Sequence, residues 1–294
     1  MMKAARFHEY GGADVIRVEP VPVPEPGAGE VLVRIAATSF NPSDTALRAG
    51  RLREVLPLSL PYIPGWDVAG TVVTGAGRWK AGDRVMGRSD AGGAAAEFAA
   101  VPATVLVEAT GFPDLATAAA VPVAGLTAWQ AVIEHGKVTA GQRVLINGAG
   151  GGVGGFAVQL AKLAGATVIA TASPRSAATV ADLGADEVVD YTRSTLPAGM
   201  DAVINLAPIG PEEAAVLATL VRPGGTGVSV AAPVQGFFSF SARNDPGQVA
   251  ELDALAAKGE LRVDVTETVP LDGLADLHRR SEAGLTRGKV LIAV

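Results

Sequence analysis

The residues from Gly148 to Gly154 carry the clearest chemical signal in the chain, because six of these seven are Gly or Ala. The apolar residues at 144–146 just before them predict a short buried strand. After them, apolar residues recur at helical spacing up to Ala164, and Gly165 supplies a helix stop. Small residues let a backbone approach phosphates, and a helix start offers free N–H groups and a positive dipole end. This strand, turn and helix therefore predict a binding site for the pyrophosphate of a dinucleotide.

Two registers of the G-x-G-x-x-G pattern fit this turn. The first places Ala149, Gly151 and Gly154 at the three small positions, and the second is shifted by one residue and ends at Gly155. We favour the first, because it leaves the helical face that starts at Val153 intact. The alternative is a flexible glycine linker, but strand and helix patterns stand on the correct sides for a dinucleotide. The predicted cofactor contacts of the turn are Ala149, Gly150, Gly151, Gly152, Val153 and Gly154.

The elements around this turn predict an α/β protein. Up to residue 121, short strand patterns at 31–35, 68–73 and 95–101, with a turn at 82–87 feeding another, are separated by Pro and Gly. This pattern is typical of a compact, barrel-like domain. From residue 118 onwards, Ala-rich helices alternate with short apolar strands, which predicts βαβ units and a parallel sheet. The expected strands lie at 144–147, 167–171, 187–189, 202–206 and 226–230, with an edge strand at 237–240; the expected helices lie at 152–164, 176–183 and 212–221.

The last part of the chain predicts a helix at 248–258, a strand at 261–269, a helix at 271–283 and a strand at 289–294. A length of 294 residues favours about two domains. We see no internal repeat.

Composition excludes several classes of function. The net charge of −6 argues against a nucleic acid or another polyanion as partner. No apolar run is long enough for a membrane span, and the N-terminus lacks the apolar core of a signal peptide. There is no cysteine, and His8, His135 and His278 show no metal-ligand spacing. These features favour a cytoplasmic enzyme without disulfides or thiolate chemistry.

Further motifs follow one another in order along nearly the whole chain: NPSD at 41–44, IPGWDVAG at 63–70, GDRV at 82–85, VPVAGLTAWQ at 121–130, LGAD at 183–186 and RGKV at 287–290. With the glycine turn, they resemble the zinc-free quinone oxidoreductase branch of the medium-chain dehydrogenase/reductase superfamily. The resemblance implies a GroES-like catalytic domain at 1–121, a Rossmann NADP(H)-binding domain at 122–260 and a return to the catalytic domain at 261–294. It further implies an active site between the domains and a homodimer paired through the nucleotide-binding domains.

The resemblance also implies a site without metal. Zinc-dependent relatives have a cysteine where Asn41 stands and a histidine where Trp66 stands, and neither replacement is a plausible zinc ligand. Without a Lewis acid, a simple alcohol or ketone is hard to polarise. The expected activity is therefore NADPH-dependent reduction of a quinone or another conjugated carbonyl compound. The alternatives are an enoyl reductase of a biosynthetic pathway and a non-catalytic NADPH-binding redox sensor.

Two residues are candidates for the catalytic centre. Asn41 is held extended by Pro42, and the resemblance implies that its amide contacts the nicotinamide or a substrate oxygen. The alternative is a turn Asn that bonds its own backbone. Asp44 is expected to act as a structural hydrogen-bond acceptor. Thr127 is expected to contact the nicotinamide side, its alternative being a helix-interior Thr bonded to its own helix.

The choice between NAD and NADP(H) depends on the residues about 20 positions after the glycine turn. An NAD enzyme usually has Asp or Glu there, but this chain has no acid at 170–175. Ser173 can donate a hydrogen bond, Arg175 can bind a phosphate with its forked guanidinium, and the resemblance places Tyr191 beside the adenosine phosphate. The alternative for Arg175 is a solvated first-turn arginine. The sequence therefore predicts NADP(H).

Other positions bear on the cofactor and the substrate. Arg287 and Lys289 are also candidates for cofactor contact, with a basic turn before the last strand as the alternative. Leu285 stands where relatives often have a histidine. Leu52 stands where quinone oxidoreductases often carry a tyrosine, which predicts a more apolar substrate pocket.

Overall fold

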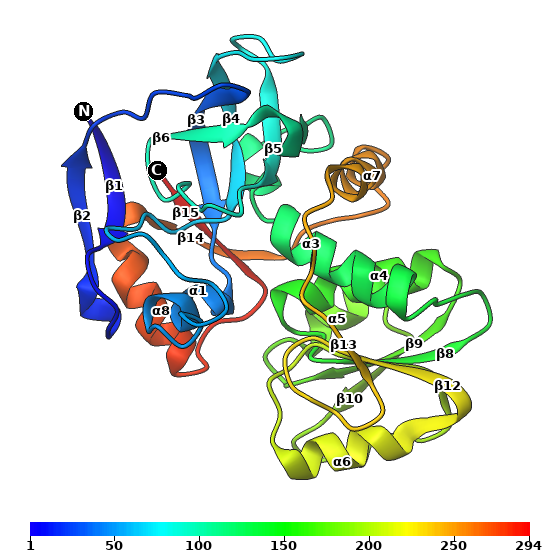
Figure 1. Ribbon diagram of the computed structural model, residues 1–294. Helices are drawn as coiled ribbons and strands as arrows, with labels where there is room; N and C mark the ends of the chain where they lie inside the picture. Colours follow the sequence, from blue (N-terminus) through cyan, green and yellow to red (C-terminus); the bar gives the residue numbers. More distant parts are fainter. The chain divides into compact units, whose positions relative to one another are not determined.

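The computed structural model describes residues 1–294 and divides into two compact units (Figure 1). The first comprises Met1–Val123, Asn244–Glu260 and Val265–Val294; the second comprises Ala124–Arg243 and Leu261–Asp264. The expected boundary at 121/122 lies within two residues of the observed one. The later boundary differs, because residues 244–260 group with the first unit. No helix combines the length and the apolar character that crossing a membrane requires.

The second unit is built on a six-stranded parallel sheet with the order β10-β9-β8-β11-β12-β13. Numbered along the chain, this order reads 3-2-1-4-5-6, the doubly wound arrangement that binds dinucleotides where the strand order reverses. The reversal lies between β8 and β11. The predicted α/β class with a parallel sheet is confirmed. The strands are β8 (Arg143–Asn147), β9 (Thr167–Ala172), β10 (Glu187–Asp190), β11 (Met200–Asn205), β12 (Val221–Ser229) and β13 (Phe238–Ser239).

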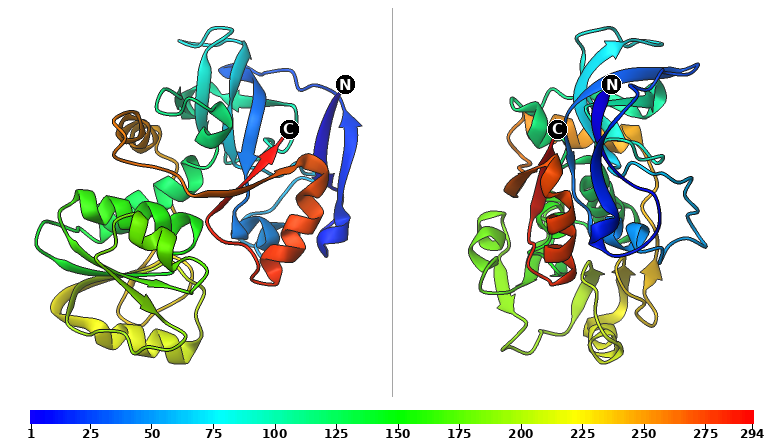
Figure 2. Two further views of the ribbon diagram at one scale, coloured as in Figure 1. Left: turned by 180° about the vertical axis from the view of Figure 1, so that it is seen from behind. Right: turned by 90° about the vertical axis from the view of Figure 1, so that its left-hand side faces the viewer.

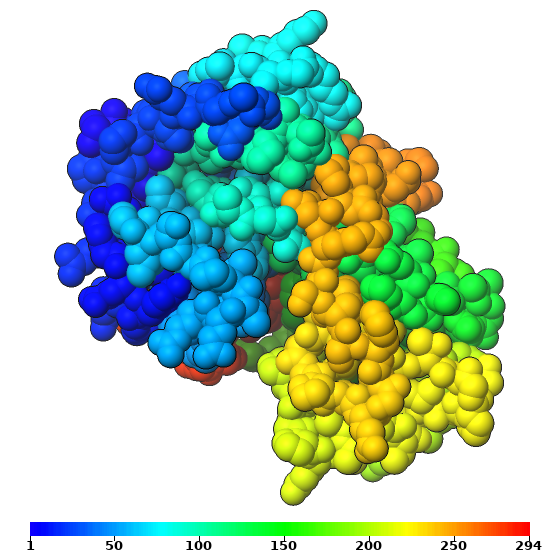
Figure 3. Space-filling model, viewed as in Figure 1, coloured from blue at the N-terminus to red at the C-terminus, as the bar shows by residue number.

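Helices α4 (Gly152–Leu163) and α6 (Pro211–Leu220) cover opposite faces of this sheet (Figure 1). Helix α5 (Ala177–Asp182) follows β9 and packs on β9 and β10. Pro211 stands in the first turn of α6 with two glutamates, the start that proline and acidic residues favour. The segment after β12 runs over the surface of this unit, where Figure 3 shows it in yellow and gold. Apolar side chains from the sheet and from α6 form one core between them.

The first unit contains a seven-stranded sheet with the order β14-β15-β3-β4-β5-β7, with β6 pairing β3. Strand β15 pairs antiparallel with β3, so the C-terminal segment completes a sheet begun by the N-terminal part (Figure 2). A separate antiparallel pair, β1 and β2, precedes it in the chain. The strands are β1 (Met2–Phe7), β2 (Ile16–Val21), β3 (Glu30–Ser39), β4 (Asp67–Thr74), β5 (Arg84–Arg88), β6 (Phe98–Pro102), β7 (Leu106–Glu108), β14 (Val265–Pro270) and β15 (Lys289–Ala293).

The first unit has four short or medium helices: α1 (Pro42–Arg48), α2 (Leu115–Ala118), α7 (Pro246–Ala257) and α8 (Leu274–Glu282). Helix α3 (Pro122–Trp129) begins at the boundary and continues into a π-helical turn, Gln130–His135. Helix α8 packs beside α1 and buries Leu274 and Leu277 against the sheet. These contacts bring the start of α1, the start of β4 and the start of β15 into one small region.

Helix α7 groups with the first unit for a physical reason. The carboxylate of Asp253 is buried and accepts hydrogen bonds from the backbone N–H groups of Thr110 and Gly111. A Cβ on Gly111 would lie 2.3 Å from the backbone oxygen of Asp253, so the loop after β7 and this helix are in direct contact. The sequence patterns predicted the helix but not the unit to which it belongs.

Candidate functional site

The glycine turn lies between β8 and α4, where the sequence predicts it. Gly148 adopts a left-handed conformation with φ of 88°, and Gly151 is the residue that precedes the first turn of α4. A Cβ on Gly154 would lie 2.3 Å from the backbone oxygen of Gly148, whereas a Cβ on Gly151 would meet nothing closer than 3.4 Å. A Cβ on Gly155 would meet only a leucine side chain, at 3.3 Å. An open middle position and a closely packed last position are what a dinucleotide turn requires, so the geometry favours the first frame.

The carboxyl edge of the sheet beside this turn holds polar side chains that the sequence analysis missed. They are Thr171, Asn147, Asn205 and Ser229, each at or next to the end of its strand and each buried. Thr171 accepts from the N–H of Gly148 at 2.9 Å, so the turn is bonded directly to β9. The signal available in the sequence was a polar residue at the same place in four predicted strands.

The residues expected to select NADP(H) lie at the same edge. Strand β10 pairs with β9 so that Asp190 is opposite Ala172, and Tyr191 and Ser173 are the residues that directly follow these two strands. Tyr191 is 56% exposed, and Arg175 is also exposed. The segment after β9 carries no acidic side chain. The carboxylate of Asp190 is bonded to the N–H and hydroxyl groups of Thr192, which holds its pKa below the usual range. The contacts of Ser173, Arg175 and Tyr191 with a cofactor stay predictions.

In the first unit, Asn41 lies between two buried charges. Its Nδ2 donates to Oδ2 of Asp67 at 2.8 Å, and its Oδ1 accepts from Nζ of Lys289 at 3.0 Å. Asp67 also accepts from the hydroxyl of Ser39 and, at 2.7 Å, from the N–H of Val123. Lys289 lies 3.8 Å from Asp67 and is 3% exposed. Burial lowers the pKa of Lys289, and the nearby carboxylates oppose that effect.

The structure departs from the alternative expected for each of these two residues, and a contact of Asn41 with the nicotinamide or the substrate stays a prediction. The side-chain amide of Asn41 makes its shortest hydrogen bonds to two side chains distant in sequence, and only a longer contact, 3.4 Å, joins it to its own backbone neighbour Ser39. Lys289 does not lie in a solvated basic turn, because it is the buried first residue of β15. Arg287 precedes that strand, is half-buried, and accepts at its backbone oxygen from Thr266. Cofactor contacts by Arg287 and Lys289 stay predictions.

Asp44 is the acceptor that the sequence predicts. Its Oδ2 accepts from the N–H of Asn41 at 2.9 Å and so caps the start of α1. Its Oδ1 is buried without a hydrogen-bond partner. Burial raises the pKa of Asp44 to about 7, with a smaller contribution in the same direction from the charge of Asp67.

Trp66 packs against an apolar cluster of the first unit. Its ring Nε1 donates to the hydroxyl of Tyr62 at 3.3 Å, and the guanidinium of Arg88 lies 5.8 Å from its ring centroid. Tyr62, Leu52 and Trp66 belong to one apolar cluster, and burial raises the pKa of Tyr62 to about 12. No group of three or more His, Cys, Asp or Glu side chains is arranged so as to hold a metal ion. Thr127 is buried in α3, and its role at the nicotinamide stays a prediction.

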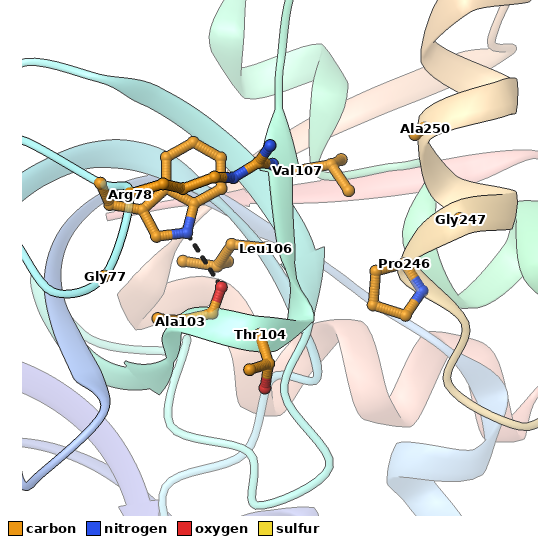
Figure 4. A pocket seen from close by; sticks show the side chains of 10 residues that line it. Gly77, Arg78, Ala103, Thr104, Leu106, Val107, Pro246, Gly247 and Ala250 are labelled. Atoms are coloured by element: carbon orange, nitrogen blue, oxygen red, sulfur yellow. Dashed lines mark hydrogen bonds between the residues drawn. The ribbon is translucent and has the colours of Figure 1, made fainter.

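A separate pocket of about 460 Å³ lies in the first unit and contains none of the predicted site residues. It is lined by the turn at Arg78, the segment from Ala103 to Val107 and the start of α7 (Figure 4). Arg78 stacks on the ring of Trp79, whose Nε1 donates to the backbone oxygen of Ala103 at 2.9 Å.

Comparisons with known proteins identify the family. The model of the GroES-like domain of alcohol dehydrogenases matches residues 27–113, and the model described as zinc-binding dehydrogenase matches residues 183–292. The chloroplastic NADPH-dependent alkenal/one oxidoreductase of Arabidopsis thaliana is 32% identical and aligns with 99% of this chain and 79% of its own length. The chain belongs to the quinone oxidoreductase-like branch of the medium-chain dehydrogenase/reductase superfamily.

Other members of this branch match as well. The chloroplast envelope quinone oxidoreductase homolog of Arabidopsis thaliana is 43% identical over 65% of this chain, and the match spans 61% of that protein's length. The structure of the quinone oxidoreductase from Coxiella burnetii has a TM-score of 0.90 at 29% identity, with 100% of this chain and 99% of that chain covered. A mycobacterial structure complexed with NADPH has a TM-score of 0.86 at 29% identity, with both chains fully covered.

Proposed function

We propose that this chain is an NADPH-dependent, zinc-independent oxidoreductase that reduces a quinone or another conjugated carbonyl compound. One observation supports the proposal above all: where zinc-dependent members of the superfamily have a cysteine ligand, Asn41 stands, with its amide between Asp67 and Lys289. An amide in this setting is a poor zinc ligand, so the substrate must accept a hydride without a Lewis acid. Quinones, enones and enals meet that requirement because conjugation spreads the developing charge onto oxygen.

The residues around the glycine turn fit NADPH. Backbone N–H groups at the start of α4 would bind its pyrophosphate, and a Cβ on Gly151 would meet nothing closer than 3.4 Å, which leaves room for a phosphate to approach. Ser173, Arg175 and Tyr191 would hold the adenosine phosphate at the ends of β9 and β10. NADPH, when bound, supplies the hydride. The names of a relative, the alkenal/one oxidoreductase, and of a solved structure include NADPH, which supports the same choice.

The buried cluster of Asn41, Asp67 and Lys289 would hold the Asn41 amide in a fixed orientation rather than transfer protons. Lys289 donates to the amide oxygen and Asp67 accepts from the amide nitrogen, so the plane of the Asn41 side chain is fixed. Preorganised dipoles of this kind stabilise charge that develops on a substrate oxygen without reorganising during the reaction. No His or Cys belongs to this cluster and its one Lys is bonded to Asn41, so water would supply the proton to the reduced product.

The test is a panel of substrates with purified protein. We expect NADPH consumption with 1,4-benzoquinone or with a long-chain enone, no useful oxidation of secondary alcohols with NADP⁺, and unchanged activity after treatment with a chelator. Stereospecifically deuterated NADPH should transfer its label to the product. Stoichiometric zinc that is lost together with activity, or product hydrogen derived from solvent at the hydride position, would overturn the proposal.

An enoyl reductase is the second candidate, and one observation favours it. Relatives that align with 99% of this chain are named for the reduction of alkenals, alkenones and a 2-methylene-furan-3-one. Leu52 in the apolar cluster agrees with an alkyl-bearing substrate. A higher kcat/KM for the enone than for the quinone would decide for this candidate. Tight NADPH binding without turnover of any substrate would favour a redox sensor instead.

The state of assembly and the compartment belong to the same proposal. We propose a homodimer, as the resemblance implies, and light scattering at micromolar concentration tests it. A monomer mass would overturn it. Cytoplasmic location is proposed from composition alone, and several relatives are named as chloroplastic proteins.

A further inference from the structure

A continuous chain of buried hydrogen bonds crosses the carboxyl edge of the parallel sheet. Thr171 donates to Oδ1 of Asn147 at 2.8 Å, Nδ2 of Asn147 donates to Oδ1 of Asn205 at 2.8 Å, and Nδ2 of Asn205 donates to Ser229 at 2.9 Å. The four residues lie on β9, β8, β11 and β12, which are neighbours in the sheet. Asn205 is directly opposite both Asn147 and Ser229 in register. All four side chains are at least nine-tenths buried.

The three side-chain bonds all run in the same direction across the sheet, from Thr171 on β9 to Ser229 on β12. At one end the N–H of Gly148 donates to Thr171, and at the other the hydroxyl of Ser229 donates to the backbone oxygen of Ala232. Hydrogen bonds in such a series polarise one another and strengthen in a low dielectric. Because each buried polar group in the series has a partner, the series avoids the penalty of an unpaired buried group.

The ends and branches of the series reach the loops after three strands. The N–H of Gly148 belongs to the glycine turn after β8. Asn205 also donates to the backbone oxygen of Ala207 at 3.1 Å, in the loop after β11, and Ser229 fixes Ala232, in the loop after β12. In a doubly wound sheet the dinucleotide binds where the strand order reverses, which here lies between β8 and β11. The series therefore spans the reversal and connects the loops around it.

We propose that Thr171, Asn147, Asn205 and Ser229 are positioning residues for dinucleotide binding, and that they hold these loops in the cofactor-binding geometry before the cofactor arrives. Apolar residues could fill the same space at these strand ends, but they would leave the N–H of Gly148 and the backbone oxygens of Ala207 and Ala232 without these partners. The hydrogen bonds of the series keep the loops at fixed distances from one another. Loops that are ordered before the cofactor binds raise its affinity, because binding does not then have to meet the entropic cost of ordering them. The inference rests on the proposed function in taking NADPH as the ligand.

Thr171→Val gives the sharpest test, because valine has the same shape and keeps the preference for a strand. It removes the acceptor of the Gly148 N–H and the donor to Asn147 together. Without these bonds the glycine turn can leave its binding conformation. If only about one molecule in ten then has the turn in that conformation, the Kd for NADPH rises about tenfold. Thr171→Ser keeps the hydroxyl and should restore the wild-type Kd within about twofold. The matched control is Thr167→Val, at the exposed opposite end of the same strand, which should leave the Kd unchanged.

The Kd is measured by isothermal titration of NADPH at a temperature at which thermal melting shows each variant fully folded. A Thr171→Val variant with a lower Tm and the wild-type Kd would overturn the inference, since the residue would then be merely structural. Should Thr171→Val not fold, Ser229→Ala takes its place, because it leaves the glycine turn bonded; a Kd raised about threefold supports the inference and an unchanged Kd overturns it. Wild-type protein that binds NADPH without turnover would overturn only the proposed reductase. Wild-type protein that does not bind NADPH would overturn both.

Discussion

Replacing Asp44 with Asn tests the electrostatics of the candidate site most directly. The two side chains have the same shape, and Asn can still accept the hydrogen bond that Asp44 receives from the N–H of Asn41. What changes is the charge, because the carboxylate of Asp44 is buried and its Oδ1 has no hydrogen-bond partner. Burial disfavours the ionised form, which is why the pKa of Asp44 rises to about 7 from its ordinary value of 3.8.

The sign of the effect follows from proton uptake. Between pH 3.8 and about 7, Asp44 is ionised in the unfolded chain and protonated in the folded one. The folded state therefore binds more protons, and the free energy of unfolding falls as the pH rises through this window. The difference between the pKa of Asp44 in the unfolded and in the folded chain corresponds to about 4 kcal/mol of unfolding free energy. The substituted side chain cannot ionise, so Asp44→Asn does not lose this unfolding free energy as the pH rises. The variant should be more stable than wild type above pH 7 by up to about 4 kcal/mol and about equal to it near pH 4.

Urea unfolding at a series of pH values measures this difference. Trp66 and Trp79 lie in the first unit and Trp129 in the second, so a Trp129→Phe background lets fluorescence report on the first unit alone. Asp272→Asn, at an exposed position of the same unit, is the matched control and should show no comparable trend. A difference between wild type and Asp44→Asn that does not change from pH 4 to pH 8 would refute the reasoning.

Three further predictions concern other parts of the two units. Lys289→Met removes one partner of a buried ion pair and should destabilise the first unit by about 3–5 kcal/mol. The double variant that also carries Asp67→Asn should lose less stability than Lys289→Met alone, because no unpaired charge is left buried. If the losses measured by denaturant unfolding add up instead, the two residues are not coupled. Gly154→Ala forces a Cβ within 2.3 Å of a backbone oxygen and should abolish tight NADPH binding, whereas Gly155→Ala should be tolerated in the same titration. Arg175→Ala should weaken NADPH binding by about tenfold and leave NADH binding unchanged, and equal losses for both cofactors would show that it does not bind the phosphate.

Much of the second unit could be predicted from its sequence because its signals are local. Buried parallel strands are short apolar runs, and the helices between them begin and end at residues with clear propensities. The strands at 144–147, 167–171, 187–189 and 202–206 are all present within one or two residues. Strand β12 begins earlier than expected, at Val221, because its interior contains Gly224 and Gly225, which strand patterns disfavour.

The first unit was harder to predict. Strands β1 and β2 pair only with each other as a sheet, and their sequences mix charged and apolar residues without clear alternation. The strand expected from residue 261 begins at Val265, because residues 261–264 group with the second unit, where the N–H of Arg262 donates to Gln159. The bounds of these strands depend on which distant segments pair with each other, and the periodicity within one segment does not show which segments those are.

The candidate site shows the same division between local and distant information. The capping role of Asp44 could be predicted, since it depends on residues three apart in one helix turn. The partnership of Asn41 with Lys289 could not, because 248 residues separate them and only the pairing of β15 with β3 brings them together. Asp67 was visible only as part of a motif, and the structure places it at the centre of the cluster.

A loss of activity on substitution of Asn41 therefore has two possible causes: a lost contact with the substrate, or a disturbed cluster. Removal of one catalytic hydrogen-bond donor typically lowers kcat by about 10²–10³, and we expect Asn41→Ala to slow turnover to that extent while NADPH binding survives. The same change also leaves the ammonium of Lys289 and the carboxylate of Asp67 without their shared partner, which would disturb the site even if Asn41 never contacts the substrate. Lys289→Met disturbs the same cluster and leaves the Asn41 side chain in place. If Asn41 contacts the substrate, kcat must fall further in Asn41→Ala than in Lys289→Met; equal losses would mean that the cluster acts only by shaping the site.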